Sequence, residues 1–374
     1  MTGNHSLQHP LQSTPLRDLH GELEGQIVPF AGYEMPLQYP LGILKEHLHT
    51  RSAAGLFDVS HMGQLAIVGD DPASVIESLV PGDIMELEHG ATRYTQLTDD
   101  NGGILDDLMV TRNGKQLLLV VNAACKVKDI AHIRSALPNG HELLELQDRA
   151  LIALQGPKSA SILSELGSAQ LLRMPFMSMA EVKVNGIACR IWRSGYTGED
   201  GYEISCRAGD VEIIARLLLE NKAVEPIGLG ARNSLRLEAG LCLYGHDIDC
   251  STTPVEANLL WSIGKRRREE GGFPGAEFVQ RQISKGVARR RVGIKPDGRA
   301  PMRDGVELFD TEGVSIGNVT SGGFGPSIGR PVAMGYIATR SARAKTPIQG
   351  NVRGKMLDAS VVRMPFIEQR YFRG

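Results

Sequence analysis

Apolar and polar residues recur along the chain with the two periods that are typical of helices and strands. Residues 41–55 have the spacing of an amphipathic helix, which Gly55 is expected to close. Residues 56–71 favour extended structure. Another helix is expected to follow, with Asp71 as its N-cap and Pro72 at its first position. The first part of the chain is thus predicted to mix both kinds of element.

The order of a strand followed by a helix returns further along the chain. Residues 115–137 predict a strand and then a helix from about Ala123, and residues 141–166 repeat this order with a switch at Gly156. Hairpin strands, a helix and a second helix are then predicted for 182–207, 208–221 and 228–245. Because the turns are often tight and rich in glycine, we expect mixed and antiparallel sheets, and therefore an α+β fold.

The composition changes after about Lys265, where the chain becomes basic and is punctuated by glycine and proline. Short strand-like runs follow at 306–310, 314–323 and 332–338. They predict a small all-β domain from about residue 286 onward. The chain is therefore expected to divide into an N-terminal region, 1–285, and a C-terminal β domain, 286–374.

Composition and charge narrow the classes of function. The chain has 374 residues, of which 42% are hydrophobic and 22% charged, as in ordinary globular proteins. The formal net charge of −2 predicts no general affinity for nucleic acid or for an anionic membrane, and no apolar run is long enough to span a bilayer. Residues 1–15 lack the pattern of a targeting peptide. A cytoplasmic location is predicted, or the mitochondrial matrix if the chain is a processed eukaryotic form.

Common metal and nucleotide motifs are missing from the sequence. The five cysteines are scattered without a C-x-x-C pair, and His47 and His49 would point to different faces of a helix, so neither a zinc site nor a disulfide framework is predicted. The segment "GLGAR", 228–232, lacks the third glycine of a dinucleotide fingerprint and is better interpreted as a helix N-terminus. No phosphate-binding loop occurs. The sequence therefore predicts no metal, flavin or nucleotide cofactor.

Two adjacent carboxylates stand where packing should dominate. In "NGGILDDLMVTR", 101–112, Asp106 and Asp107 interrupt an apolar run that otherwise predicts a strand. Neighbouring residues on a strand point to opposite faces, so the two cannot share a proton as an acid dyad. One is expected to face a cleft and the other solvent or a structural partner. The alternation of apolar residues does not choose between them.

Two further polar groups allow two interpretations. The turn "RSGYTGEDGYEIS", 193–205, carries several acidic and tyrosine side chains, and Arg232 and Arg236 lie one turn apart on a predicted helix, with Glu238 close by. They fit a structural ion pair with solvated turns, and they fit a binding pocket equally well.

Six motifs in series resemble one family. They are "LFDVSHM" (56–62), "GGILDDL" (102–108), "GYTGEDGYEIS" (195–205), "ARNSLRLEAGLCLYGHDID" (231–249), "TPVEANL" (253–259) and "VTSGGFGPS" (319–327). Together they resemble the aminomethyltransferases of the glycine cleavage system, the T-proteins, from about Thr14 to Tyr371. The resemblance implies a cloverleaf of two folate-binding α+β lobes and a C-terminal β-barrel. It also implies transfer of one carbon from an aminomethyl group on the lipoyl arm of the H-protein to tetrahydrofolate, giving 5,10-methylenetetrahydrofolate, ammonia and dihydrolipoyl H-protein.

The resemblance also implies a set of site residues. Asp106 matches the family's catalytic carboxylate. Glu203 matches the acceptor for the pterin edge, Arg232 the arginine that binds the pterin or supports Glu203, and Tyr371 an aromatic that closes the pocket. Further pocket positions are matched by Met62, Tyr94, Asn122, Phe176 and Tyr196. Core packing is the alternative role for Met62 and Phe176.

The expected partner is the lipoylated H-protein, and the chain is expected to be a monomer. Two basic clusters, 265–268 and 289–291, are candidates for docking this acidic partner, with Arg291 as the side chain expected to reach the cleft. For 265–268 the alternative is a solvated loop whose charges neutralise one another.

Two rival functions are considered. A demethylating oxidase of the sarcosine or dimethylglycine type would need a flavin fingerprint, and a non-catalytic folate-binding protein of iron–sulfur assembly would lack the complete "GGILDDL" and "GYTGEDG" pair.

Overall fold

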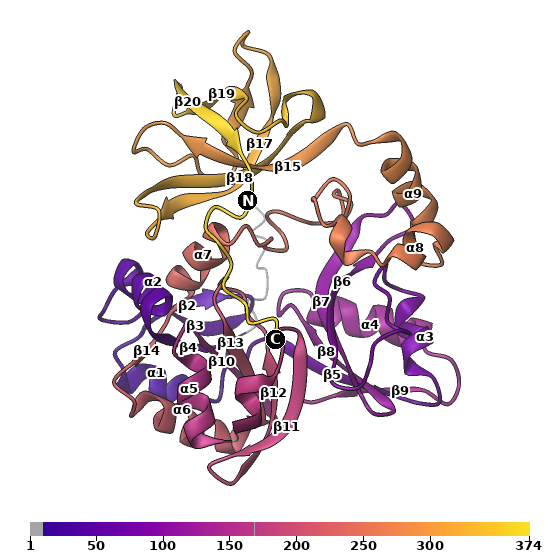
Figure 1. Cartoon of the computed structure of the whole chain (residues 1–374), viewed down its shortest axis with the longest axis vertical. Coiled ribbons are helices and arrows are strands. Elements are labelled where there is room, and N and C mark those ends of the chain that lie inside the picture. Colours follow the sequence, from indigo (N-terminus) through magenta and orange to yellow (C-terminus); the bar gives the residue numbers. More distant parts are fainter. Residues whose placement is uncertain (1–9, 168) are drawn as a thin grey trace, which may run out of the picture.

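The computed structural model of the protein describes residues 10–167 and 169–374. Two lobes each combine helices with a large sheet, and a closed β-barrel stands above them in Figure 1. Helix α7 (Leu229–Glu238) contacts both the first lobe and the barrel strands. The predicted α+β fold with a C-terminal β-barrel is confirmed.

The first lobe is built on a six-stranded sheet in the order β11-β12-β13-β10-β4-β14. In that order the strands are Ser178–Val184, Ile187–Arg193, Gly201–Arg207, Arg149–Gln155, Ala54–Asp58 and Val224–Pro226. Helices α5 (Ser159–Leu166) and α6 (Val211–Leu219) pack on this sheet. The smaller sheet β1-β3-β2 and two helices complete the lobe: Gln12–Ser13, Tyr33–Gln38, Gln26–Phe30, α1 (Arg17–Glu22) and α2 (Ile43–Ser52).

The second lobe is built on a five-stranded sheet in the order β6-β7-β8-β5-β9. In that order the strands are Thr92–Thr98, Ile104–Asn113, Gln116–Val121, Gly63–Val68 and Glu142–Glu145. Helices α3 (Pro72–Glu77) and α4 (Lys126–Ala136) belong to this lobe. The Asp71 side chain accepts a hydrogen bond from the backbone of Ser74, so the predicted N-cap of α3 is confirmed.

The barrel follows two connecting helices, α8 (Lys265–Glu270) and α9 (Ala276–Lys285). Its strands close in the order β15-β18-β17-β16-β19-β20. In that order they are Arg289–Pro296, Arg330–Ala338, Ser315–Gly325, Glu307–Phe309, Pro347–Val352 and Lys355–Val362. Closure leaves the barrel without exposed sheet edges.

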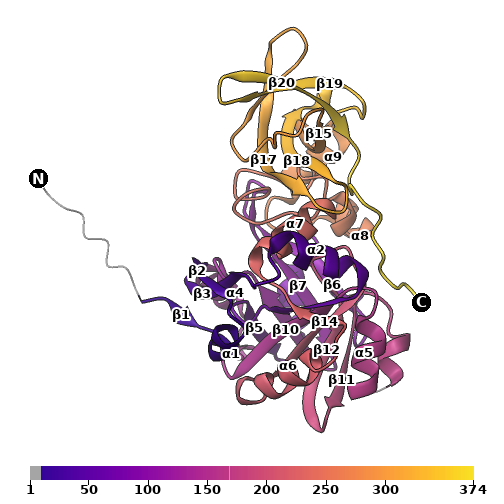
Figure 2. The same ribbon diagram turned by 90° about the vertical axis from the view of Figure 1, so that its left-hand side faces the viewer.

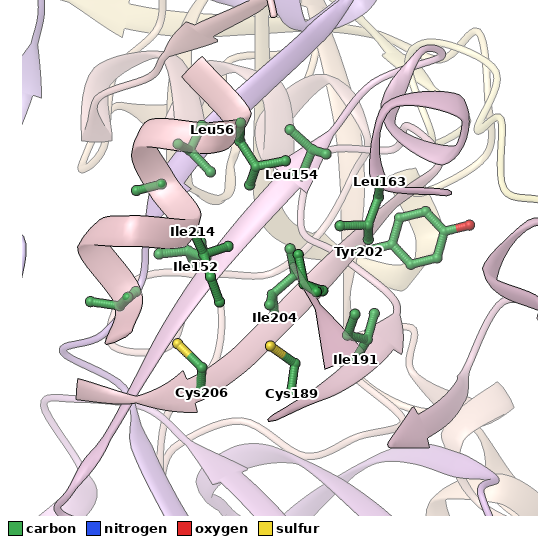
Figure 3. Packing of buried hydrophobic residues seen from close by; sticks show 14 of the residues in the cluster. Leu56, Ile152, Leu154, Leu163, Cys189, Ile191, Tyr202, Ile204, Cys206 and Ile214 are labelled. Atoms are coloured by element: carbon green, nitrogen blue, oxygen red, sulfur yellow. The ribbon is translucent and has the colours of Figure 1, made fainter. Parts of the chain in front are cut away.

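The two large sheets turn their inner faces toward each other. One apolar cluster holds Phe57, Leu151 and Trp192 from the first sheet together with Ala66 and Leu118 from the second. The outer face of each sheet is buried under its own helices. Figure 3 shows this outer core in the first lobe, where side chains of the sheet meet α5 and α6. The space between the inner faces is therefore where a ligand can reach side chains of both lobes.

The end of the chain returns from the barrel to the first lobe. Figure 2 shows this last segment running down beside the lobes after β20. The backbone N–H of Phe366 donates to the carbonyl of Glu238 at 2.9 Å, and that of Arg370 donates to Gly198 at 2.9 Å. The carbonyl of Phe372 accepts from the backbone of Phe176 at 2.7 Å. The last residues thus connect the barrel to the first lobe.

Some predicted boundaries shift for local reasons. Helix α2 ends at Ser52, and Gly55 lies inside the buried strand β4. A Cβ on Gly55 would stand 2.5 Å from the Thr50 hydroxyl, so this glycine permits close packing and does not close the helix. Helix α4 begins at Lys126 and not near Ala123. The helix predicted over 228–245 ends earlier, at Glu238.

Candidate functional site

A pocket lies between the inner faces of the two large sheets. The second sheet contributes Met109 and Val120, and the first contributes Leu151, Trp192 and Glu203, with Ser194 beyond the end of β12. The walls are largely apolar, and Glu203 adds an acidic group. Apolar walls with few polar groups are the kind of lining that small-molecule sites have, and the cavity between these side chains has a volume of about 10 Å³.

The alternation along β7 gives Asp106 and Asp107 different surroundings. Asp106 is fully buried on the side of Leu108 and Val110, whose side chains belong to the outer core of the second lobe. Asp107 is half-buried and lies on the side of Met109, which lines the pocket. The geometry therefore does not support Asp106 as the carboxylate that faces the pocket. Its neighbour Asp107 lies on the pocket side of the strand.

Asp107 is held by two donors. The Tyr94 hydroxyl donates to Oδ2 at 2.8 Å, and the Asn122 amide donates to Oδ1 at 2.7 Å. Burial and the negative charge of Asp106 together raise the pKa of Asp107 to about 7. A carboxyl with such a pKa exchanges a proton near neutral pH, which is what a general base requires.

Asn122 connects the two carboxylates. Besides its bond to Asp107, its amide donates to Asp106 Oδ1 at 2.8 Å, and its backbone N–H donates to Asp106 Oδ2 at 3.1 Å. Asn122 stands directly after β8, which pairs with β7. One residue therefore contacts both carboxylates and fixes their positions.

Glu203 lies on β13 of the first sheet and lines the pocket. Its Oε2 accepts from the Ser194 hydroxyl at 2.6 Å. Helix α7 presents the Arg232 guanidinium over the ring of Tyr196, with 4.8 Å between the guanidinium carbon and the ring centre. Burial lowers the pKa of Arg232, while Tyr196 and Glu203 favour its charged form. Three predicted pocket residues thus act on one another electrostatically.

The remaining predicted residues lie around these groups. Met62 packs against the inner apolar cluster of the two sheets. Phe176 and Tyr371 stack with 4.0 Å between ring centres and 10° between ring planes. Burial raises the pKa of Tyr371 to about 12, so its hydroxyl stays protonated. This stack is next to the end of β12, because the backbone of Met177 donates to the carbonyl of Arg193 at 2.8 Å.

Two aromatic residues near these groups were not predicted from the sequence. Trp192 lines the pocket, and its indole N–H donates to the Thr111 hydroxyl at 2.8 Å, which joins the two sheets. Trp261 stacks on Tyr94 with 5.4 Å between ring centres, although 64% of its surface is exposed. The alternation in 187–193 could have placed Trp192 on the inner face. No sequence pattern pointed to Trp261.

The two basic clusters have mostly structural partners. Arg267 is buried and donates to the carbonyls of Glu77, Val80 and Gly272. Arg291 is 4% exposed, and its guanidinium donates to the carbonyls of Ala257 and Gly240.

Two further arginines of the clusters form ion pairs. Arg266 pairs with Glu77, Asp83 and Glu270, while Arg289 pairs with Glu256. The expectation that Arg291 reaches the cleft as a docking side chain is therefore wrong, because that arginine is enclosed by backbone acceptors.

Within residues 10–167 and 169–374, no group of three or more His, Cys, Asp or Glu side chains is arranged to hold a metal ion. Among the helices of the same residues, none combines the length and the apolar character needed to cross a membrane.

Comparisons with known proteins agree along nearly the whole chain. Residues 16–267 match the family model for the GCVT N-terminal domain, and residues 289–368 match that for the glycine cleavage T-protein C-terminal barrel domain. The mitochondrial aminomethyltransferase of Homo sapiens is 46% identical over 98% of this chain and 92% of its own length. That of Dictyostelium discoideum is 45% identical over 98% of this chain and 95% of its own length.

A solved structure gives the same result in three dimensions. The crystal structure of glycine cleavage system aminomethyltransferase T from Bartonella henselae superimposes with a TM-score of 0.91 and is 44% identical. The match covers 97% of this chain and 99% of that one. Since two family models match in order and relatives of this identity match at nearly full length, the chain belongs to the glycine cleavage T-protein family and is an aminomethyltransferase.

Proposed function

We propose that this aminomethyltransferase binds tetrahydrofolate in the pocket between its two sheets and takes the carbon from an aminomethyl group on a lipoylated H-protein. The products would be 5,10-methylenetetrahydrofolate, ammonia and dihydrolipoyl H-protein. The single observation that supports this best is the pocket between the two sheets, which is lined by Glu203 from the first sheet and by Met109 of β7, the strand that also carries Asp107. Tetrahydrofolate would supply the two nitrogens that accept the carbon.

The pocket residues fit a reduced pterin. Its amino-pyrimidine edge presents N–H donors, for which the carboxylate of Glu203 is a matching acceptor. Met109, Val120 and Trp192 offer apolar surface for the flat ring. Arg232 lies near enough to Glu203 for the two opposite charges to attract each other. These contacts would orient the ring and exclude water from its faces.

Asp107 is proposed as the carboxylate that acts on the transferred carbon, in place of Asp106. The aminomethyl group becomes cationic as the sulfur leaves and again as ammonia leaves, and a fixed negative charge in a partly dry pocket stabilises such cations better than water does. The same carboxylate can accept the proton from the attacking folate nitrogen as the ring closes. Tyr94 and Asn122 hold it in place for both tasks.

Removal of the pterin acceptor is expected to weaken folate binding. Glu203→Ala should lower the affinity for tetrahydrofolate by about 1–3 kcal/mol, because two buried donors of the pterin would lose a charged acceptor. Isothermal titration with tetrahydrofolate measures this directly. Glu212→Ala, on the exposed face of α6, is the control and should bind like the wild type. Unchanged affinity of Glu203→Ala would mean that the pterin is held elsewhere.

The rate is expected to depend on pH through Asp107. Below pH 7 a carboxyl with a pKa of about 7 is largely protonated and cannot act as a base, so kcat/KM should rise with pH and level off above that value. The measurement is kcat/KM against pH at fixed ionic strength. Asp107→Asn should lose this rise, and a wild-type profile that is flat through pH 7 would contradict the role of Asp107 as a base.

The decisive test of the overall proposal is ammonia release from aminomethylated H-protein with and without tetrahydrofolate. Folate-dependent release together with methylenetetrahydrofolate formation supports the proposal, and ammonia release at the same rate without folate would contradict it.

We also propose that residues 1–285 form the folate-binding region and 286–374 a separate barrel unit, and that the protein works as a monomer. The five cysteines are free, which fits a reducing compartment such as the cytoplasm.

A further inference from the structure

A second buried carboxyl lies behind the pocket, on the far side of strand β7. Asp129, in the first turn of α4, is 2% exposed, and its Oδ2 meets no hydrogen-bond donor among the described residues. Its side chain lies in hydrogen-bond contact with that of Asp106, which is also fully buried. Two ionised carboxylates are both acceptors, so this contact requires a proton on one of them.

The surroundings decide which carboxyl carries the proton. Asp106 accepts two N–H bonds from Asn122, one on each carboxylate oxygen. Asp129 has an oxygen without a donor. Burial and the nearby Asp106 charge raise the pKa of Asp129 to about 9. The proton therefore belongs to Asp129, whose O–H donates to the Asp106 carboxylate.

Asp106 in turn acts on the carboxyl in the pocket. The two aspartates share the Asn122 amide, and the charge of Asp106 contributes to the raised pKa of Asp107. An O–H that donates to Asp106 spreads that charge away from Asp107. A chain of contacts thus runs from Asp129 through Asp106 and Asn122 to the pocket.

We propose that Asp129 is a positioning residue of the aminomethyl transfer: its protonated carboxyl holds Asp106 as an anion, and Asp106 with Asn122 sets the orientation and proton affinity of Asp107. The inference rests on the proposed function of Asp107. It places Asp106 between the proton donor Asp129 and the proposed catalytic carboxylate of Asp107. No contact of Asp129 with substrate is required.

Other titratable groups act on this chain of carboxyls and have to stay constant in a test. The groups that face the three aspartates from α4, β6 and the loops are Tyr94, Cys125, Lys128, Tyr196, Cys242 and Tyr244. Burial raises the pKa values of the tyrosines and cysteines among them. They stay neutral in the pH range of the experiment, so changes there report on the aspartates.

The first experiment tests the proton on Asp129 and needs no catalysis. Infrared spectra of protein with ¹³C-labelled aspartate carboxyls are recorded at about pH 8, in an Asp107→Asn background that removes the pocket carboxyl. We expect the C=O band of a protonated carboxyl, and we expect it to vanish when Asp129→Asn is added. Asp100→Asn, an exposed position, should leave the band in place. Absence of the band, or its survival in the Asp129→Asn variant, would overturn the proposal.

The second experiment tests the coupling to the pocket. In ¹³C NMR titrations, Asp129→Leu should move the titration of Asp107 to higher pH by about half to one unit, because Asp106 loses its O–H donor and its charge acts more fully on Asp107. Asp129→Asn keeps an N–H donor and should titrate close to wild type. An unmoved or lowered titration in Asp129→Leu, or an equal shift in both variants, would refute the coupling.

In each variant, the pH at which kcat/KM rises should shift in the same direction as the Asp107 titration measured by NMR. Because the NMR titration reads Asp107 without turnover, a fully active Asp107→Asn enzyme would refute the proposed function of Asp107 separately from this coupling. Equal losses of rate in Asp129→Leu and Asp129→Asn, with unshifted pH profiles, would show that Asp129 is only structural.

Discussion

Asp107→Asn is expected to lower the turnover number about 100- to 10,000-fold, the usual worth of a positioned general base. The amide can still accept a bond from Tyr94, so the pocket should keep its shape. It cannot take the proton from the folate nitrogen, and it carries no charge to stabilise the cationic carbon. The measurement is single-turnover ammonia release from aminomethylated H-protein at saturating tetrahydrofolate. Folate affinity should stay near wild type.

Asp106→Asn is the matched comparison, because it makes the same chemical change one residue earlier on the same strand. Its side chain lies on the side of the outer core, so its loss should be smaller than that of Asp107→Asn and should come with a changed pH profile. This order is the reverse of the one implied by the family motif. A larger loss in Asp106→Asn, with Asp107→Asn nearly active, would restore the original assignment.

Asp247→Ala is expected to destabilise the fold by about 3–5 kcal/mol, because it leaves a buried guanidinium without its partner. The Asp247 carboxylate is fully buried and accepts from Arg236 at 2.6 Å, from Ser321 at 2.8 Å and from the backbone of Leu243 at 3.0 Å. Arg236 comes from α7 and Ser321 from the barrel. The change should therefore also loosen the barrel from the first lobe.

Urea unfolding followed by circular dichroism measures the loss of stability, and limited proteolysis at the connection before β15 measures the loosening. Glu212→Ala removes an exposed pair with Arg216 and should change stability little, since surface ion pairs contribute little. Asp247→Asn keeps an acceptor for the same donors. Its free energy of unfolding should therefore lie between those of Asp247→Ala and Glu212→Ala. An Asp247→Ala protein as stable as wild type would show that the buried pair does not hold the barrel in place.

Local patterns determined much of the architecture. The α+β lobes and the terminal barrel could be predicted from the amphipathic period, the N-cap at Asp71 and the composition change near residue 265. These patterns are informative because helices and strands depend largely on residues that are close in the sequence. The motifs determined the family, since six of them recur in order. They also named Tyr94 and Asn122, which the fold brings to Asp107, and Glu203, whose charge acts on Arg232.

The sequence could not decide which of two adjacent aspartates faces the pocket. Alternation along β7 puts them on opposite sides, but both sides of that strand are apolar, so only the packing of α4 on one side and of the first lobe on the other tells them apart. The sequence likewise could not decide which arginines of the two basic clusters are buried. A row of arginines predicts a charged surface, yet the fold surrounds Arg267 and Arg291 with backbone carbonyls that come from distant segments. The sequence determined which chemical groups this protein has, and the tertiary structure decided which of them are buried, paired or turned toward a substrate, because those properties depend on contacts between residues far apart in the chain.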